Sequence, residues 1–228
     1  MKWTELFTSS VGKKVIMSIT GISLIGFLVV HAGINACIWA NDSGEMFNKA
    51  AHFMGHTIVI RILEVGLFVG ILLHIVQGLA LEFQNRSKRQ KGYQVPMGNK
   101  GSKWYSRSMG LLGTLILLFL IMHISHFWIS SRITHDLAPV DINGSEYENL
   151  YLRMVEVFQS PVVVILYVLG CFSLAWHLMH GFQSAFRTLG VHNQRYLTLL
   201  HSVGVAFSVI VPLVFAMMPV SIVLGWIS

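Results

Sequence analysis

Four histidines in apolar segments of the chain lie at matched distances from glycines. In two segments a glycine precedes the histidine by ten residues, and in two others a glycine follows it by four. The pairs are Gly21 with His31, Gly113 with His123, His74 with Gly78, and His177 with Gly181. Imidazole is costly to bury without a partner, and it is the commonest metal ligand in proteins. The repeated spacing therefore indicates a shared task, with metal ligation the first chemistry to consider.

The segments that carry these histidines are long enough to cross a lipid bilayer. The 228 residues are 54% hydrophobic and only 11% charged, whereas soluble domains carry about 25% charged residues. A helix of about 20 apolar residues spans the hydrocarbon core. Five segments meet that length: 12–40, 57–83, 108–131, 161–186 and 198–226. The sequence predicts an all-α integral membrane bundle of five transmembrane helices, forming a single domain over 1–228.

The basic residues predict how the helices are oriented. Most of the 16 Lys and Arg residues precede the first segment, or lie between the second and third or between the fourth and fifth. Most acidic residues lie in the remaining connections. Under the positive-inside rule the N-terminus is cytoplasmic and the C-terminus outside. The net charge of +6 then reflects membrane topology and does not indicate a nucleic-acid surface.

The depth of each histidine predicts how the four pair. His31 and His123 lie well past the middle of helices that run outward, and His74 and His177 lie late in helices that run inward. We therefore expect His31 to face His123 toward the outside, and His74 to face His177 toward the cytoplasm. Two imidazoles that face each other across a bundle are the arrangement of a bis-histidine haem, whose iron only exchanges electrons.

The glycines fit two such haems. Gly78 and Gly181 lie one turn from a histidine on the same helix face, where a missing side chain lets a porphyrin edge approach. Gly21 and Gly113 precede their histidines by about 15 Å along a helix, which is the depth of the other haem. Small residues also let membrane helices pack closely, and the two roles are compatible.

Two other interpretations of the histidines remain open. Closely spaced pairs also occur in the histidine boxes of membrane di-iron enzymes. The pairs here are His52-x-x-x-His56, His123-x-x-His126 and His177-x-x-His180. Such boxes must converge on one metal pair, whereas the first two are expected outside and the third inside, and His31 and His74 would have no role. The other alternative is a non-redox membrane protein whose histidines are structural or bind a metal.

Together these motifs resemble the dihaem cytochrome b subunit of succinate:quinone oxidoreductases, the single-polypeptide, five-helix type of bacteria that use menaquinone. The resemblance covers all five helices. It rests on Thr20-Gly21 before His31, His74 before Gly78, Gly113 before His123, and His177 before Gly181 and Gly190. It implies that the four histidines are axial ligands of two haem b groups. It also implies a multi-pass protein of the bacterial cytoplasmic membrane.

The resemblance further implies an electron-transfer subunit of a succinate dehydrogenase or fumarate reductase. Its partners would be a flavoprotein subunit with the dicarboxylate site, which this chain lacks, and an iron–sulfur subunit. Electrons would pass between the iron–sulfur subunit and membrane menaquinone through both haems. The expected docking face is basic and comprises Lys13, Lys14 and residues 86–107. The direction of the reaction stays open.

Rim residues follow from the resemblance and from position. The quinone is expected near the outer haem, with Glu64 and Arg61 as candidates, although an ion pair between the two explains them equally well. Haem propionates need cationic or hydroxyl partners. The inner candidates are Ser18, Arg107, Arg187 and His180, and the outer ones are His126 and Arg132.

One class of protein shares the general design. A haem b anchor of another membrane dehydrogenase, such as a hydrogenase or formate dehydrogenase, is the alternative, although such subunits lack the paired glycine–histidine spacings. One departure from the family also concerns the fourth helix. Trp176 and Leu178 flank His177, where some fumarate reductases carry a glutamate linked to proton movement, so a proton path through this helix is not expected.

Overall fold

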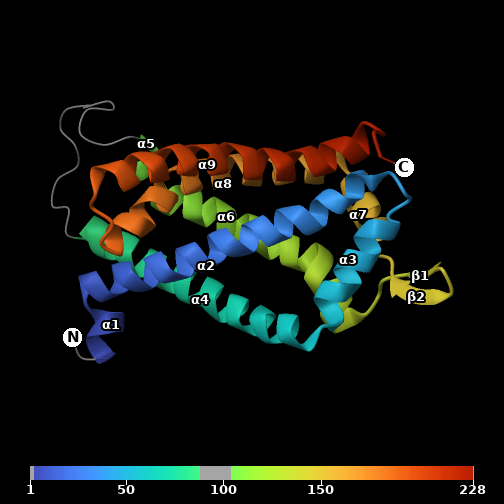
Figure 1. Ribbon diagram of the computed structural model, residues 1–228, viewed down its shortest axis with the longest axis horizontal. Helices are drawn as coiled ribbons and strands as arrows, with labels where there is room; N and C mark the ends of the chain where they lie inside the picture. Colours follow the sequence, from blue (N-terminus) through green and yellow to red (C-terminus); the bar gives the residue numbers. More distant parts are fainter. Residues whose placement is uncertain (1–2, 88–103, 228) are drawn as a thin grey trace. The chain divides into compact units, whose positions relative to one another are not determined.

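The computed structural model describes residues 3–87 and 104–227, which are mostly helical (Figure 1). Five long helices carry most of the chain: α2 (Ser10–Ala36), α4 (Ile58–Ser87), α6 (Met109–His123), α8 (Pro161–Thr188) and α9 (Gln194–Val223). The shorter elements are α1 (Trp3–Thr8), α3 (Glu45–His56), α5 (Trp104–Arg107), α7 (Leu150–Phe158) and the strands β1 (Pro139–Ile142) and β2 (Ser145–Glu148).

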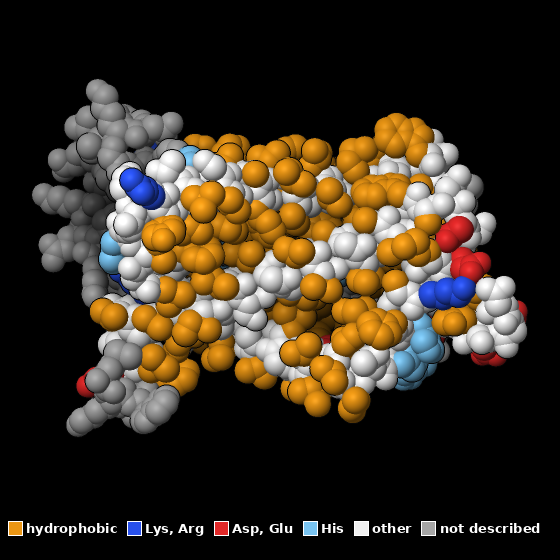
Figure 2. Space-filling view, in the orientation of Figure 1, with side chains coloured by type: hydrophobic (Ala, Val, Ile, Leu, Met, Phe, Trp, Pro, Cys, Tyr) orange, Lys and Arg blue, Asp and Glu red, His pale blue; other side chains and the backbone are white. Residues whose placement is uncertain are grey.

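The five predicted membrane segments are confirmed as helices. Five helical stretches are long and apolar enough to cross a membrane: Ser10–Ala40, Ile58–Ser87, Met109–Thr134, Pro161–Thr188 and Gln194–Val223. Large apolar side chains remain exposed along them, for example Ile58 at 71% and Phe83 at 75%. On the face drawn in Figure 2, hydrophobic side chains cover most of the surface of the long helices. This is the surface that lipid requires.

The ends of the segments differ from those predicted, because hydropathy marks the apolar length and local caps decide where a helix stops. The first segment finishes as a 3₁₀ helix, η1 (Cys37–Ala40), which stops at Asn41 in the left-handed conformation. The last helix begins at Gln194, four residues before the predicted start, and the Asn193 side chain accepts a hydrogen bond from the backbone N–H of Arg195. α8 ends before Gly190, whose φ of +98° favours glycine.

The third membrane helix changes its winding directly after His123. Its last part consists of two π-helical stretches, η2 (Ile124–Trp128) and η3 (Ser130–Thr134), and the predicted end at 131 is three residues short. π-Helical turns are rare and often occur at functional sites. The wider turn sets the directions of the side chains that follow a predicted ligand.

The connection between this helix and α8 holds a small β-hairpin, which the all-α prediction did not include. β1 and β2 are antiparallel, and Ile142 is paired with Ser145. The two residues between the strands, Asn143 and Gly144, have φ of +57° and +80°. An Asn-Gly turn with positive φ at both positions matches the twist of a two-residue hairpin.

The described contacts divide the chain into two compact units, and each long helix contributes to both. The first unit comprises Met1–Phe27, Gly66–Leu115 and Ser173–Val209, and the second comprises Leu28–Val65, Ile116–Phe172 and Ile210–Ser228. That the whole chain forms one domain stays a prediction. Each unit is described by itself below.

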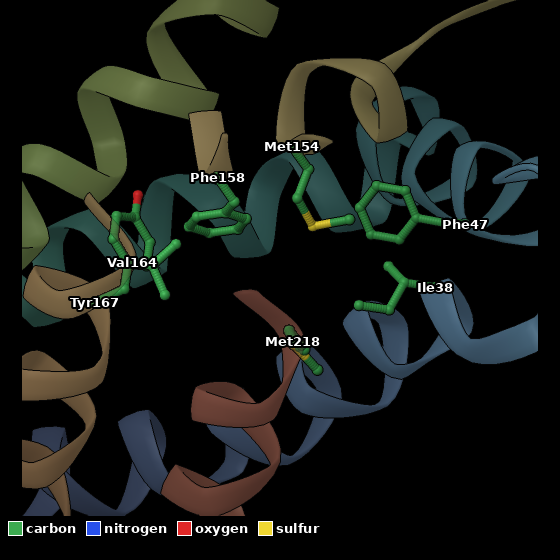
Figure 3. Close-up of a cluster of buried hydrophobic side chains, with 7 residues drawn as sticks. All are labelled: Ile38, Phe47, Met154, Phe158, Val164, Tyr167 and Met218. Atoms are coloured by element: carbon green, nitrogen blue, oxygen red, sulfur yellow. The ribbon is translucent and has the colours of Figure 1, made fainter. Parts of the chain in front are cut away.

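A buried apolar cluster fills the second unit (Figure 3). Its members come from five different elements: η1, α3, α7, α8 and α9. They are Ile38, Phe47, Met154, Phe158, Val164, Tyr167 and Met218. The cluster packs η1, α3 and α7 against α8 and α9 within this unit. Ala36 of α2 and Phe119 and Met122 of α6 pack against it, so it also contacts the helices that carry His31 and His123.

Candidate functional site

The first unit brings His74 of α4 beside His177 of α8. Their ring centroids are 6.2 Å apart with an interplanar angle of 64°. The second unit brings His31 of α2 beside His123 of the third membrane helix, with centroids 5.7 Å apart and an angle of 88°. These are the two pairs that depth in the sequence predicted. That the four are haem ligands stays a prediction.

The separations fit a metal between the rings. Two imidazoles that bind one metal from opposite sides, each through a bond of about 2 Å, have centroids about 6 Å apart. Both pairs have this separation. The Nδ1 atoms of His123 and His177 are also buried without a hydrogen-bond partner among the described residues. These two ring nitrogens therefore receive no hydrogen bond from the described residues, and it is the centroid separation that supports a metal between the rings.

His74 has a defined hydrogen-bond partner on the neighbouring helix. The Thr20 hydroxyl lies 3.0 Å from His74 Nδ1, so this edge of the imidazole is occupied and the Nε2 edge is left for another group. Ligating histidines are commonly held through their second ring nitrogen in this way. In the second unit the Asn35 side-chain amide lies 3.3 Å from His31 Nδ1.

The four glycines of the repeated spacing all lie in the first unit, with the His74–His177 pair. A Cβ placed on Gly21 would lie 3.6 Å from His74 Cε1, and one on Gly78 would lie 3.5 Å from Met17 Cε. Around Gly113 and Gly181 a Cβ would meet nothing within 4 Å. Gly21 thus lies at the level of the histidine on another helix, as its spacing predicted, and Gly113 and Gly181 border open space.

The predicted inner rim residues lie in the first unit too. His180 and Arg187 line a cavity of about 290 Å³ together with Gln183, Ser184 and Thr188 on the last turns of α8. Ser18 is buried and its hydroxyl donates to the Lys14 carbonyl. The cavity offers a cation and several hydrogen-bonding groups, which suits an acidic group such as a propionate.

Only part of the expected basic docking face lies within the described residues. Lys14 is exposed, whereas Lys13 is buried at 8% exposure, so Lys13 does not belong to a docking surface. The long predicted loop 86–107 falls mostly on residues 88–103, which lie outside the described residues.

His126, three residues after the predicted ligand His123, contacts Tyr167, whose ring also lies near His123. Its Nδ1 lies 3.0 Å from Tyr167 Oη, and the two rings are stacked. Tyr167 in turn lies 6.0 Å from His123 between ring centroids. Arg153 of α7 donates to the His126 backbone carbonyl. The π-helical turn at His126 is therefore bonded to α8 through Tyr167 and to α7 through Arg153.

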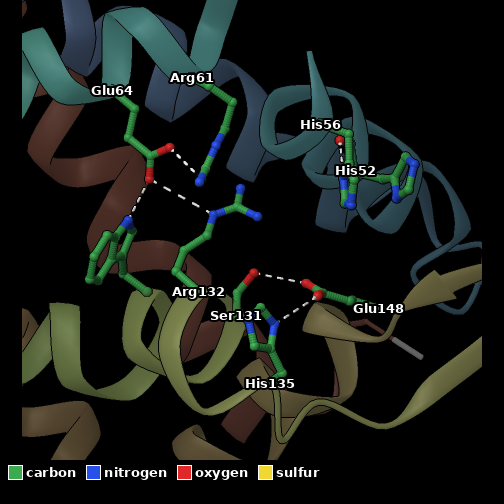
Figure 4. Close-up of polar contacts among 9 residues, drawn as sticks. His52, His56, Arg61, Glu64, Ser131, Arg132, His135 and Glu148 are labelled. Atoms are coloured by element: carbon green, nitrogen blue, oxygen red, sulfur yellow. Dashed lines mark hydrogen bonds and ion pairs between the residues drawn. The ribbon is translucent and has the colours of Figure 1, made fainter. Parts of the chain in front are cut away.

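The quinone candidates Glu64 and Arg61 form an ion pair that extends to the π-helical segment (Figure 4). Arg61 Nη1 donates to Glu64 Oε2 at 2.8 Å, and Trp128 Nε1 donates to Glu64 Oε1 at 2.5 Å. Arg132 Nε lies 3.8 Å from the same oxygen. Glu64 therefore forms the ion pair with Arg61 that the sequence indicated as the alternative to quinone binding, and 19% of its side chain is exposed. A role in quinone binding stays a prediction.

His52 and His56 of α3 stack on each other near this network, with centroids 3.8 Å apart. They line a cavity of about 60 Å³ with Ser131, Arg132 and Glu148, which is small beside the ~300–1,000 Å³ of sites for drug-sized ligands. Within 3–87 and 104–227, no group of three or more His, Cys, Asp or Glu residues is arranged to hold a metal ion.

The sequence did not identify three residues that lie near the histidines in the structure. Gln77, three residues after His74, is buried with its Oε1 unpartnered among the described residues. Asn35 and Tyr167 contact the other pair or its neighbour. Gln77 and Asn35 carried a usable signal, because each is a polar residue one helical turn from a histidine in an apolar segment. Tyr167 carried none, because its contact crosses between helices.

The fold and the site define a helical membrane protein with two pairs of facing, half-buried histidines. Over most of its length the chain is similar to the succinate dehydrogenase cytochrome b558 subunit of Bacillus subtilis (strain 168). The two are 26% identical over 199 residues, which cover 83% of this chain and 89% of that protein. No family model matches the chain, and no solved structure matches it.

A second relative matches over a shorter stretch. The chain is 29% identical over 82 residues to the succinate dehydrogenase hydrophobic membrane anchor subunit of Halobacterium salinarum (strain ATCC 700922 / JCM 11081 / NRC-1), covering 36% of this chain and 61% of that protein. Together with the five apolar helices, the two similarities bear out the resemblance to membrane-anchor subunits of succinate:quinone oxidoreductases. They identify the chain as a multi-pass membrane protein.

Proposed function

We propose that this chain is the haem b-containing membrane anchor of a succinate dehydrogenase or fumarate reductase. It transfers electrons between an iron–sulfur subunit and menaquinone, and a flavoprotein subunit completes the complex. The observation that carries the proposal is the pairing of four histidines on four successive membrane helices, with ring centroids 6.2 Å and 5.7 Å apart. The similarity to a cytochrome b558 subunit over 83% of the chain supports it.

In this proposal each histidine pair holds one haem. When bound, haem b supplies an iron that accepts or gives one electron without an open coordination position. His74 and His177 would hold the haem on the side we assign to the cytoplasm, and His31 and His123 would hold the one toward the outside. His180 and Arg187, which line the cavity on α8, would bind a propionate there.

Removal of one ligand tests the assignment. His177→Ala in the assembled complex is expected to lower the haem content from two per chain to one and to weaken assembly, because one axial bond and its helix contact are lost. His201→Ala is the control, since this exposed histidine of α9 belongs to neither pair. Retention of both haems in His177→Ala would overturn the assignment. Co-purification with a flavin-bearing subunit distinguishes this complex from a hydrogenase or formate dehydrogenase.

The Glu64 network borders the quinone in this proposal. Glu64 and Arg61 present charged groups at the start of α4, and Trp128 connects them to the π-helical segment next to His123. Glu64→Gln is expected to lower quinone-dependent turnover while leaving haem content and succinate oxidation with a soluble dye unchanged. Equal turnover with quinone in the variant and the parent would show that Glu64 is only a structural ion-pair partner.

A further inference from the structure

The Thr20 side chain of α2 lies against the imidazole of His74, one of the predicted haem ligands. Thr20 is buried at 8% exposure within the first unit. Its Oγ1 lies 2.7 Å from the Ile16 carbonyl on its own helix, 3.3 Å from the Met17 carbonyl, and 3.0 Å from His74 Nδ1. One hydroxyl therefore meets two backbone acceptors and one imidazole nitrogen.

The hydrogen of this hydroxyl fixes the tautomer of His74. A threonine hydroxyl has a single proton to donate and two lone pairs to accept with. The carbonyl of Ile16 is the nearest acceptor, and the Thr20 hydroxyl donates its hydrogen bond there. Toward His74 the oxygen can then only accept, so Nδ1 of His74 must carry the N–H. In a neutral imidazole this leaves the lone pair on Nε2.

The neighbouring glycine holds the same ring from a second side. A Cβ on Gly21 would lie 3.6 Å from His74 Cε1, so the backbone of α2 closely approaches the ring at the position after Thr20. The adjacent residues of one helix thus set both the hydrogen-bonding edge of His74 and its distance from α2. His177 differs, because its Nδ1 has no partner among the described residues.

We propose that Thr20 is a positioning residue for the His74–His177 haem, which fixes the Nδ1–H tautomer of His74 and strengthens its Nε2 as a ligand. The inference rests on the proposed function, in which His74 is an axial ligand. A hydrogen-bond acceptor on the second nitrogen raises the basicity of a ligating imidazole. A more basic ligand favours ferric over ferrous iron, so Thr20 lowers the reduction potential of this haem.

Thr20→Val and Thr20→Ser separate the hydroxyl from the packing. Valine keeps the shape and removes the acceptor, whereas serine keeps the acceptor and removes a methyl group. Thr114→Val is the matched control, because the exposed Thr114 donates to its own i−4 carbonyl at 2.8 Å on another membrane helix. The full detergent-solubilised complex is titrated potentiometrically, its haem content is measured, and the low-spin ferric signals are recorded by electron paramagnetic resonance.

The expected result is a potential more positive for one haem in Thr20→Val, with a shifted low-spin signal for that haem only. Thr20→Ser and Thr114→Val should match the parent. Loss of one haem in Thr20→Val with retention in Thr20→Ser also supports the role of the hydroxyl. Unchanged potentials and signals in Thr20→Val, or equal loss in the valine and serine variants, overturn the inference. Absence of haem from the parent complex would instead refute the proposed function.

Discussion

Replacement of Asn48 by alanine tests the cap of the second unit, by which we mean α3 (Glu45–His56) and α7 (Leu150–Phe158) joined by hydrogen bonds near its histidines. Asn48 of α3 is 1% exposed. Its Nδ2 donates to Asn149 Oδ1 at 3.1 Å, and its Oδ1 accepts from the Tyr151 backbone N–H at 2.9 Å. Through these two bonds α3 is joined to the start of α7, and α7 is the helix whose Arg153 donates to the π-helical turn at His126.

The loss of stability in Asn48→Ala follows from the two hydrogen bonds that alanine cannot make. The part-buried Tyr151 N–H loses its acceptor, which costs about 1–3 kcal/mol, and the second hydrogen bond contributes about 1 kcal/mol. Asn149 Oδ1 still accepts from Leu152 N, so that side adds no orphaned group. The sum is about 2–4 kcal/mol. At about 1.4 kcal/mol per factor of ten, the opened cap becomes roughly 30- to 700-fold more populated.

Limited proteolysis of the detergent-solubilised complex measures this opening. When closing is fast relative to cleavage, the cutting rate follows the population of the open form. Asn48→Ala should therefore be cut in the region 136–160 faster by about that factor. Asn85→Ala is the control, because Asn85 is exposed in the last turn of α4 and surface changes usually alter stability by under about 0.5 kcal/mol. Equal cutting rates in the two variants would refute the role given to Asn48.

Three further changes have defined outcomes. Gly21→Leu should remove one of two haems, because side-chain atoms beyond a Cβ 3.6 Å from His74 Cε1 collide with the ring; unchanged haem content contradicts this. Gly204→Ala should lower thermal stability by about 1–3 kcal/mol, since its Cβ would lie 2.8 Å from the Phe182 ring. A threonine hydroxyl holds the pKa of Asp136 below its usual value. Its contribution is present above the unfolded-state pKa and is lost as pH falls through the lowered folded-state value, so the difference in melting temperature between the parent and Asp136→Asn should shrink in acid.

The sequence was sufficient for the features that depend on periodicity along one helix. Apolar length predicted five membrane helices, and the position of each histidine along its helix predicted that His31 would face His123 and His74 would face His177. Gly21 was likewise expected at the level of the other histidine pair from its ten-residue spacing alone. These features follow from the rise of a helix and the direction of each segment, so they need no knowledge of side-chain packing.

Features that depend on contacts between helices were not predictable in the same way. No sequence pattern after His123 specifies a π-helical turn, because the mixed polar and apolar residues of 124–134 are compatible with an ordinary α-helix as well. The bond from Trp128 to Glu64 and the stacking of His126 on Tyr167 join residues 64 and 41 positions apart. Pattern reasoning gave Glu64 two equal roles, and only its measured partners show how firmly it is held.

The haem content of the purified complex tests the central claim most directly. A pyridine haemochromogen assay, normalised to this chain by quantitative amino-acid analysis, measures haem b per chain without relying on turnover. Two histidine pairs predict two haems b per chain, both low-spin in the ferric state because both axial positions are filled. A content of one or none, or a high-spin signal that binds carbon monoxide when reduced, would contradict the account.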